Sequence, residues 1–211
     1  MNAPIKNFVF DIDGTLIDTY QMYMPALAQV VAPLGIRLTA ADLRLLYGVS
    51  AADALQALAV PQAQAGAIER AWLRTAYQHV DQVKVFAGVA TTIQRLAQTA
   101  GTQLAIVTSK HRHEYEQYFA HRYVFARHFS VVVTADDTRQ HKPHPAPLQL
   151  ALRRLQATPA ESLYVGDMPT DLAAAHAAGM RFAGADYGSM VPRKLALADS
   201  HLASPTDLLK R

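Results

Sequence analysis

The chain has 211 residues, of which 51% are hydrophobic and 18% are charged, and its formal net charge is +3. This balance excludes a disordered polypeptide, and the scattered Lys and Arg residues argue against a nucleic-acid partner. Cysteine is absent, which excludes disulfides, thiolate metal sites and a cysteine nucleophile. Without a signal-peptide pattern or an apolar run of about 18 residues, we expect a cytoplasmic protein that does not contact a membrane.

The first predicted element is a short buried strand at residues 8–10, which runs directly into the acidic stretch DIDGT at residues 11–15. Residues 20–82 carry no strand pattern. Their apolar residues recur at helical spacing and are interrupted by Pro and Gly, which predicts four consecutive helices. Thr39 and Ser50 are expected to cap two of these helices at their N-termini.

After residue 88 the pattern alternates between helix and strand. Helices are predicted at 89–100, about 112–123, 145–155 and up to 178, and strands at 103–107, 129–133, 163–165 and 181–183. Alternation of this kind is typical of a parallel sheet with helices on both faces. The predicted fold class is therefore α/β. A Rossmann-like parallel-sheet core of residues 1–18 and 84–211 is interrupted by an inserted α-helical domain of residues 19–83.

Polar side chains follow the predicted strands, and the carboxyl ends of parallel strands are where open sheets bind ligands. They are Asp11, Asp13, Thr108, Ser109, Lys142, Asp167 and Asp171. Two neighbouring carboxylates raise each other's pKa unless a positive charge lies between them, and Lys142 is the expected partner. Together these groups can hold a divalent cation and an oxyanion.

Four motifs occur in order: DIDGT at 11–15, an apolar strand ending in Thr at 104–108, Lys142, and GDxxxD at 166–171. In these motifs the sequence resembles the haloacid dehalogenase-like superfamily of phosphotransferases. The helical insert after the first motif resembles the subgroup that contains phosphoglycolate phosphatase, the PpaX-type pyrophosphatase and β-phosphoglucomutase. The resemblance covers nearly the whole chain and implies a Mg²⁺-dependent phosphatase with an aspartyl-phosphate intermediate. The insert would be a cap domain.

The resemblance also implies roles for the acidic residues. Asp11 would be the nucleophile, and Asp13 would protonate the leaving oxygen and then activate water. Asp11, the backbone carbonyl of Asp13 and Asp167 would bind Mg²⁺, which suits a cation that prefers oxygen ligands. Asp171, one helical turn after Asp167, would orient a metal-bound water or Lys142.

The phosphate would be bound by four residues. The Thr108 hydroxyl, the Ser109 N–H and the Lys142 ammonium would contact its oxygens. Gly14 would allow the sharp turn that aims backbone N–H groups at it.

Within the insert, Arg44, Gly48 and Ser50 resemble a cap loop that meets the substrate. Asp18 and Thr19 are expected to form a helix cap, with a hinge or flap position as the alternative. 

Structural rather than functional roles are expected for the aromatic residues of the insert and the histidines near the motifs. Trp72 and Tyr77 are expected in the core of the insert. Solvated loop positions are expected for His111, His113, His141 and His144.

The insert is poor in charge, which favours a small phosphorylated metabolite over a bulky sugar bisphosphate. Phosphoglycolate is the first expectation and pyrophosphate the second, and a β-phosphoglucomutase-like activity stays open. Asp13 argues against a dehalogenase, and the absence of GxGxxG after a strand argues against a dinucleotide-binding oxidoreductase. A non-catalytic binding protein is less favoured because every motif position is filled. Monomer and homodimer are both compatible with the sequence.

Overall fold

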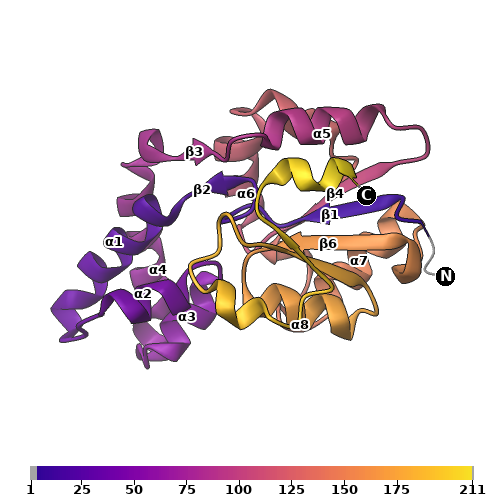
Figure 1. The fold of residues 1–211 in the computed structure, drawn as a ribbon. Helices are drawn as coiled ribbons and strands as arrows, with labels where there is room; N and C mark the ends of the chain where they lie inside the picture. Colours follow the sequence, from indigo (N-terminus) through magenta and orange to yellow (C-terminus); the bar gives the residue numbers. More distant parts are fainter. Residues whose placement is uncertain (1–3, 211) are drawn as a thin grey trace.

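A computed structural model of the chain describes residues 4–210, and its centre is one six-stranded parallel sheet (Figure 1). The strand order is β5 (Val131–Val133), β4 (Gln103–Val107), β1 (Asn7–Phe10), β6 (Ser162–Gly166), β7 (Arg181–Ala185) and β8 (Ser200–Leu202). Every neighbouring pair is parallel. The predicted α/β, Rossmann-like class is confirmed, and the five predicted strands agree with β1, β4, β5, β6 and β7 to within two residues at each end.

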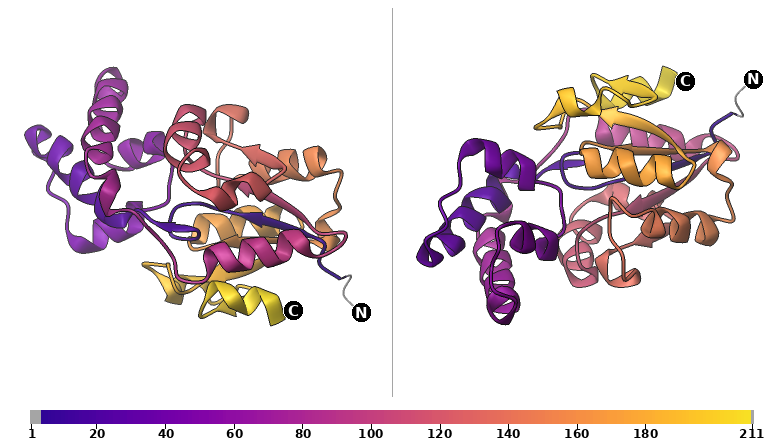
Figure 2. Two further views of the ribbon diagram at one scale, coloured as in Figure 1. Left: turned by 90° about the horizontal axis from the view of Figure 1, so that it is seen from above. Right: turned by 90° about the horizontal axis from the view of Figure 1, so that it is seen from below.

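Helices cover both faces of this sheet (Figures 1 and 2). One face carries α5 (Val89–Gln98) and the C-terminal 3₁₀ segment η8 (Pro205–Lys210), and the other carries α7 (Ala146–Leu155) and α8 (Pro169–Ala177). Side chains alternate along β1, so that Phe8 and Phe10 join the hydrophobic cluster with α5 while Val9 joins the cluster with α7 and α8. The central strand is therefore buried on both faces, as parallel sheets require.

The insert begins and ends at a two-stranded antiparallel ribbon, in which β2 (Ile17–Asp18) pairs with β3 (Lys84–Val85). Between these strands lie α1 (Tyr20–Val31), η1 (Ala32–Leu34), α2 (Ala40–Leu46), α3 (Ala51–Ala57), α4 (Gln62–Tyr77) and η2 (Val80–Gln82). The four helices share their own hydrophobic cluster and lie together beyond the carboxyl end of β1 (Figure 2). The division into domains at residues 18/19 and 83/84 stays a prediction.

Two predicted helix caps have the expected geometry. The Thr39 hydroxyl accepts the N–H of Asp42 at 3.2 Å, and the Asp42 carboxylate accepts the N–H of Thr39 at 2.8 Å, which forms a capping box. The Ser50 hydroxyl accepts the N–H of Asp53 at 3.2 Å.

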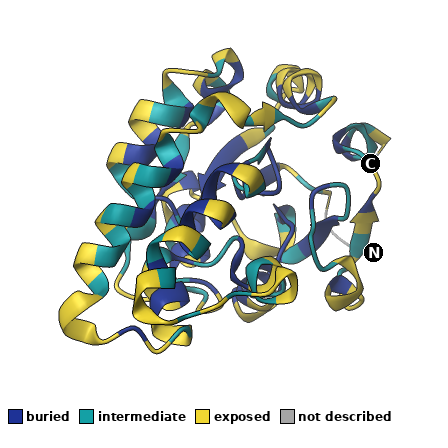
Figure 3. Ribbon diagram, turned by 90° about the vertical axis from the view of Figure 1, so that its left-hand side faces the viewer, coloured by how far each residue is buried: buried dark blue, intermediate teal, exposed yellow. Residues whose placement is uncertain are grey.

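The remaining elements are short. After β4, α6 (Arg112–Tyr115) continues as one π-type turn, η3 (Glu116–Ala120), instead of the single longer helix that was predicted. Four 3₁₀ turns complete the fold: η4 (Val124–His128), η5 (Ala135–Asp137), η6 (Pro159–Glu161) and η7 (Pro192–Leu195). Colouring by burial shows mostly buried residues along the strands of the sheet and exposed residues on the outward faces of the helices (Figure 3). Between residues 4 and 210, no helix is long and apolar enough to cross a membrane.

The insert core gives a test of the fold. Leu27 on α1 is 0% exposed in the insert cluster, whereas Leu34 in η1 is 37% exposed. We expect Leu27→Ala to lower the free energy of unfolding by about 2–5 kcal/mol, because it opens a cavity among packed side chains. The matched change Leu34→Ala should cost less than about 1 kcal/mol. Denaturant unfolding followed by fluorescence of Trp72, the single tryptophan, reports on the insert directly. Equal losses in the two variants would contradict the packing described.

Candidate active site

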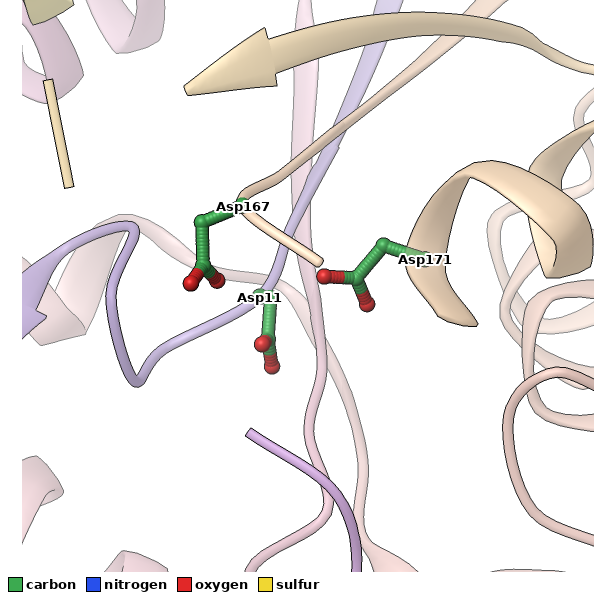
Figure 4. Close-up of side chains that lie close together, drawn as sticks. All are labelled: Asp11, Asp167 and Asp171. Carbon is green, nitrogen blue, oxygen red and sulfur yellow. The ribbon is translucent and has the colours of Figure 1, made fainter. Parts of the chain in front are cut away.

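Three buried carboxylates meet where β1 and β6 end (Figure 4). Asp11 follows β1, Asp167 follows β6, and Asp171 lies in the first turn of α8. One oxygen of each side chain lies within 4.8 Å of the others. Because β1 and β6 are neighbours in register, the fold brings residues that are more than 150 positions apart to one edge of the sheet.

Lys142 supplies positive charge at the centre of this cluster. Its Nζ lies 2.6 Å from Asp171 Oδ1 and 3.2 Å from Asp11 Oδ1, and it donates to the Tyr164 hydroxyl at 3.1 Å. Burial alone would lower the pKa of Lys142, but the two carboxylates raise it above its usual value, so the ammonium stays charged. Burial raises the pKa of Asp11 to about 7 against the opposing effect of Lys142. Lys142 is thus the positive partner that the acidic motif required.

Among residues 4–210, two carboxylate oxygens at this edge have no hydrogen-bond partner. Asp11 Oδ1 has only its ion pair, and Asp167 Oδ2 is buried without a partner, while Asp167 Oδ1 accepts the Thr15 hydroxyl at 3.3 Å. Burial raises the pKa of Asp167 well above its usual value. Unpaired buried carboxylate oxygens are costly unless a cation binds them, and an all-oxygen set suits a hard divalent cation such as Mg²⁺. The residues present therefore fit the metal that the motifs implied.

Unlike the other two carboxylates, Asp171 accepts hydrogen bonds at both of its oxygens. Its Oδ1 accepts Lys142 Nζ at 2.6 Å and the Tyr164 hydroxyl at 3.1 Å, and its Oδ2 accepts the Met168 N–H at 3.0 Å. Of the two functions expected for Asp171, the observed contacts match the orientation of Lys142.

Gly14 makes the turn after β1 possible. Its φ is +74°, and a Cβ atom there would lie only 2.2 Å from Asp167 Oδ2. The N–H of Gly14 donates to the Ile17 carbonyl at 2.9 Å, and that of Thr15 donates to Ile12 at 3.2 Å. These two N–H groups are therefore occupied within the turn, and the expectation that backbone N–H groups of this turn bind a phosphate stays a prediction.

Asp13 lies on the insert side of the turn. Its Oδ1 accepts the Thr19 hydroxyl at 2.6 Å and lies 3.0 Å from Lys110 Nζ. Of the two residues expected as alternatives for the helix cap, Thr19 makes no side-chain cap bond, and its hydroxyl donates to Asp13 instead. Asp18 does accept the N–H of Tyr20 at 3.1 Å, which is the capping contact expected of it.

Lys110 is the site residue that the sequence did not identify. It is 5% exposed, and its Nζ binds Asp13 and the hydroxyl of Tyr23. The available signal was its position directly after the strand-end pair Thr108 and Ser109, where a buried lysine faces the same edge.

The hydroxyl pair after β4 lies at the site. Thr108 is buried, and its Oγ1 accepts the Lys110 N–H at 3.2 Å, which leaves the hydroxyl proton available to an oxyanion. Ser109 lines a cavity together with Asp11 and Asp13.

This cavity, of about 50 Å³, is closed on its far side by the insert. Its insert wall includes Leu46, Tyr47, Gly48, Val49 and Trp72. Trp72 is also buried in the insert core, and Tyr77 packs against that core, as predicted.

Of the three predicted cap-loop residues, Gly48 alone lines the cavity. Its φ is +82°, and a Cβ atom there would lie 2.7 Å from the side chain of Met168, which directly precedes α8. Ser50 is buried and caps α3, and Arg44 is exposed outside the lining, so the structure does not bring these two to the cavity.

His111 is not the solvated loop histidine that was predicted. Its Nδ1 lies 2.7 Å from Asp136 and its Nε2 lies 3.1 Å from Glu69 of α4. Burial alone would lower the pKa of His111, but these carboxylates raise it above its usual value. Both partners are distant in sequence, so no local spacing revealed them. His113 is exposed, and His141 and His144 make only local backbone contacts with Ala135 and Ala146.

Buried carboxylates, a lysine and strand-end hydroxyls thus lie at the edge of the sheet that the helical insert covers. The family model described as haloacid dehalogenase-like hydrolase matches residues 8–185, and the chain belongs to that family.

Similar proteins carry phosphatase names. The chain is 32% identical to a phosphoglycolate phosphatase of Yersinia pseudotuberculosis, covering 97% of this chain and 92% of that one. It is 33% identical to the pyrophosphatase PpaX of Anoxybacillus flavithermus, covering 85% and 83%. A crystal structure of a proposed phosphoglycolate phosphatase from Lactobacillus plantarum matches with a TM-score of 0.89 at 27% identity, covering 99% of each chain. The chain is accordingly an enzyme, a phosphatase of this hydrolase family.

Gly14 offers a test of the site. Gly14 and Gly35 both have a left-handed backbone, with φ of +74° and +79°, but a Cβ atom at Gly35 meets nothing within 4 Å. We expect each change to Ala to cost about 1–2 kcal/mol of stability from backbone strain. Only Gly14→Ala should also displace Asp167 and reduce phosphate release from p-nitrophenyl phosphate by about 100-fold or more.

Thermal unfolding and a phosphate-release assay on both variants separate the two effects. Full activity of Gly14→Ala would contradict the close approach of Gly14 to Asp167.

Proposed function

We propose that this enzyme is a Mg²⁺-dependent phosphatase that hydrolyses a small phosphate monoester in the cytoplasm, with phosphoglycolate as the first candidate. The observation that carries the proposal is the buried Asp11, whose Oδ1 is ion-paired with Lys142 Nζ at 3.2 Å and accepts no hydrogen bond from the residues that the structure describes. A carboxylate held in this way beside a cation can attack an anionic phosphorus centre.

In the first step, an Asp11 oxygen would bond to phosphorus, and the bond from phosphorus to the leaving oxygen would break. Lys142 lies within reach of both the nucleophile and the transferred group, and its charge opposes their mutual repulsion. When bound by Asp11, Asp167 and the Asp13 carbonyl, Mg²⁺ would supply further charge compensation between carboxylate and phosphate.

Asp13 is suited to proton transfer by the way it is held. Between residues 4 and 210, its two side-chain contacts, from Thr19 and Lys110, both fall on Oδ1. Oδ2 can therefore protonate the leaving oxygen and later accept a proton from the water that hydrolyses the aspartyl-phosphate.

The other motif residues would hold the transferred phosphate. The free hydroxyl proton of Thr108 and the N–H of Ser109 are the proposed donors. Asp171 would act through Lys142, whose position it fixes with its 2.6 Å contact.

The cavity supports a small substrate. Residues 19–83 would act as the cap that covers it and excludes water. Its cationic lining residues, Lys110 and His111, are both already paired with carboxylates. The described lining therefore offers no free cation to a second phosphate group, which disfavours a sugar bisphosphate. Relatives named phosphoglycolate phosphatase support the first candidate, and PpaX supports pyrophosphate as the second.

The nucleophile is tested by Asp11→Asn on a substrate panel. We expect the wild type to release phosphate in the presence of Mg²⁺, fastest from phosphoglycolate among pyrophosphate, hexose phosphates and nucleoside monophosphates. Asp11→Asn should abolish release from every member while the fold is retained, because the amide is not a nucleophile at phosphorus. Circular dichroism checks the fold.

Turnover by Asp11→Asn would remove Asp11 as the nucleophile. Faster release from pyrophosphate than from phosphoglycolate would select the second candidate. If the wild type released no phosphate from the panel or from an aryl phosphate, a binding protein would be favoured.

The role of Asp13 is tested by the leaving group. An alkyl alkoxide needs a proton as it departs, whereas p-nitrophenolate does not. We expect Asp13→Asn to slow first-turnover release of the alkyl alcohol by about 10²–10⁴-fold, with a far smaller effect on p-nitrophenol. Rapid-quench measurement of the released alcohol reports this step separately from hydrolysis of the intermediate. Equal losses on both substrates would argue against the acid role.

A further inference from the structure

The ammonium of Lys110 forms an ion pair with Asp13 and also contacts Tyr23 of the insert. Its Nζ lies 3.0 Å from Asp13 Oδ1 and donates to the Tyr23 hydroxyl at 2.7 Å, and it lies 4.6 Å from the centre of the Tyr23 ring. In the described chain, Asp13 and Tyr23 are the two side chains that hold this ammonium. Tyr23 belongs to α1 of the insert, whereas Lys110 follows β4 of the sheet.

The proton of the Tyr23 hydroxyl points away from Lys110. Tyr77 donates to Glu114 Oε1 at 2.8 Å, and the Tyr23 hydroxyl lies 3.1 Å from the same oxygen and 2.7 Å from the Tyr77 hydroxyl. Whether the Tyr23 hydroxyl donates to Glu114 or to Tyr77, a lone pair on its oxygen faces Lys110. Burial raises the pKa of Tyr23 well above its usual value, so the phenol keeps that proton.

Glu114 fixes this arrangement from the sheet side. It is buried on α6, and its Oε2 accepts the His111 N–H at 2.9 Å, so both of its oxygens are engaged. The Tyr23 backbone is held within the insert, because its carbonyl accepts Trp72 Nε1 at 2.8 Å. Tyr23 is therefore held at its backbone by Trp72 of the insert and at its hydroxyl by Glu114 of α6.

A lysine side chain is a flexible stem with many rotamers, and it holds one position only when several partners fix its head. If Tyr23 moved away with the insert, the ammonium of Lys110 would keep Asp13 as a partner but lose the contact that directs it. Its charge on Asp13 Oδ1 is what reserves Oδ2 for proton exchange at the cavity.

We propose that Tyr23 is a positioning residue for the proton-transfer step. Its hydroxyl holds Lys110 against Asp13 Oδ1, so that Asp13 is correctly set only when the insert is seated on the sheet. This inference rests on the proposed acid role of Asp13.

The test compares Tyr23→Phe with Tyr77→Phe. Both changes remove one phenol hydroxyl near Glu114, but Tyr77 does not contact Lys110. Tyr23→Phe should slow first-turnover release of an alkyl alcohol by about tenfold or more, while p-nitrophenol release and KM change less than about threefold. Tyr77→Phe should have no such selective effect.

Lys110→Met and the double variant Tyr23→Phe/Lys110→Met complete a double-mutant cycle that measures the coupling between the two residues. Because Tyr23 acts through Lys110, the double variant should lose no more alkyl selectivity than Lys110→Met alone. Lys110→Met also keeps the inference testable if Tyr23→Phe fails to fold, since it should show the same selective loss.

Equal losses on both substrates, the same selective loss in Tyr77→Phe, or additive losses in the double variant would overturn the inference. The wild type and Asp13→Asn, assayed in parallel, separate its failure from that of the proposed function. An active wild type and a selective Asp13→Asn beside an unselective Tyr23→Phe would reject the role of Tyr23 alone. An inactive wild type would reject both.

Discussion

The site depends on one buried ammonium, that of Lys142, held between the carboxylates of Asp11 and Asp171. Removing one partner from such a cluster leaves an uncompensated charge inside the protein, which costs several kcal/mol. The hydroxyl of Tyr164 completes the shell around the ammonium, and each member comes from a different segment of the chain. The ends of β1 and β6, the loop before α7 and the first turn of α8 must therefore meet at one place.

The sheet provides the energy that holds these charges together. β1 lies between β4 and β6, and its side chains enter both hydrophobic clusters, which fixes the strand on two faces. Burial of this apolar surface is favourable enough to tolerate Asp11 and Asp167, whose pKa values are raised because burial disfavours their charged forms. The carboxylate oxygens without a hydrogen-bond partner among the described residues are thus maintained by packing elsewhere, and they are where a bound cation would gain most.

Local patterns were enough to predict much of this arrangement. The apolar strand before DIDGT, the helical periodicity of the insert and the caps at Thr39 and Ser50 are each encoded within a few residues. Strand β8 was missed because Ser200–Leu202 is short and half polar, and the π-type turn after α6 has no sequence signature. The partners of Lys110 and His111 come from remote segments, so they depend on how the insert sits on the sheet. Arg44 was offered for the cap loop from its spacing to Gly48, and that spacing says nothing about which way α2 faces.

The two carboxylates proposed to be catalytic, Asp11 and Asp13, differ in the residues that hold their cationic partners. Asp11 has Lys142, which is fixed wholly by residues at the carboxyl edge of the sheet and is indifferent to the insert. Asp13 has Lys110, which is shared with Tyr23 across the domain boundary, and Thr19, whose hydroxyl lies 3.0 Å from that of Tyr47 in the insert. The proposed nucleophile is thus positioned by contacts within the sheet edge, whereas the proposed proton donor is positioned by contacts from both the sheet and the insert. An enzyme built in this way can keep its nucleophile ready at all times and still restrict protonation of the leaving group to the closed, water-poor cavity.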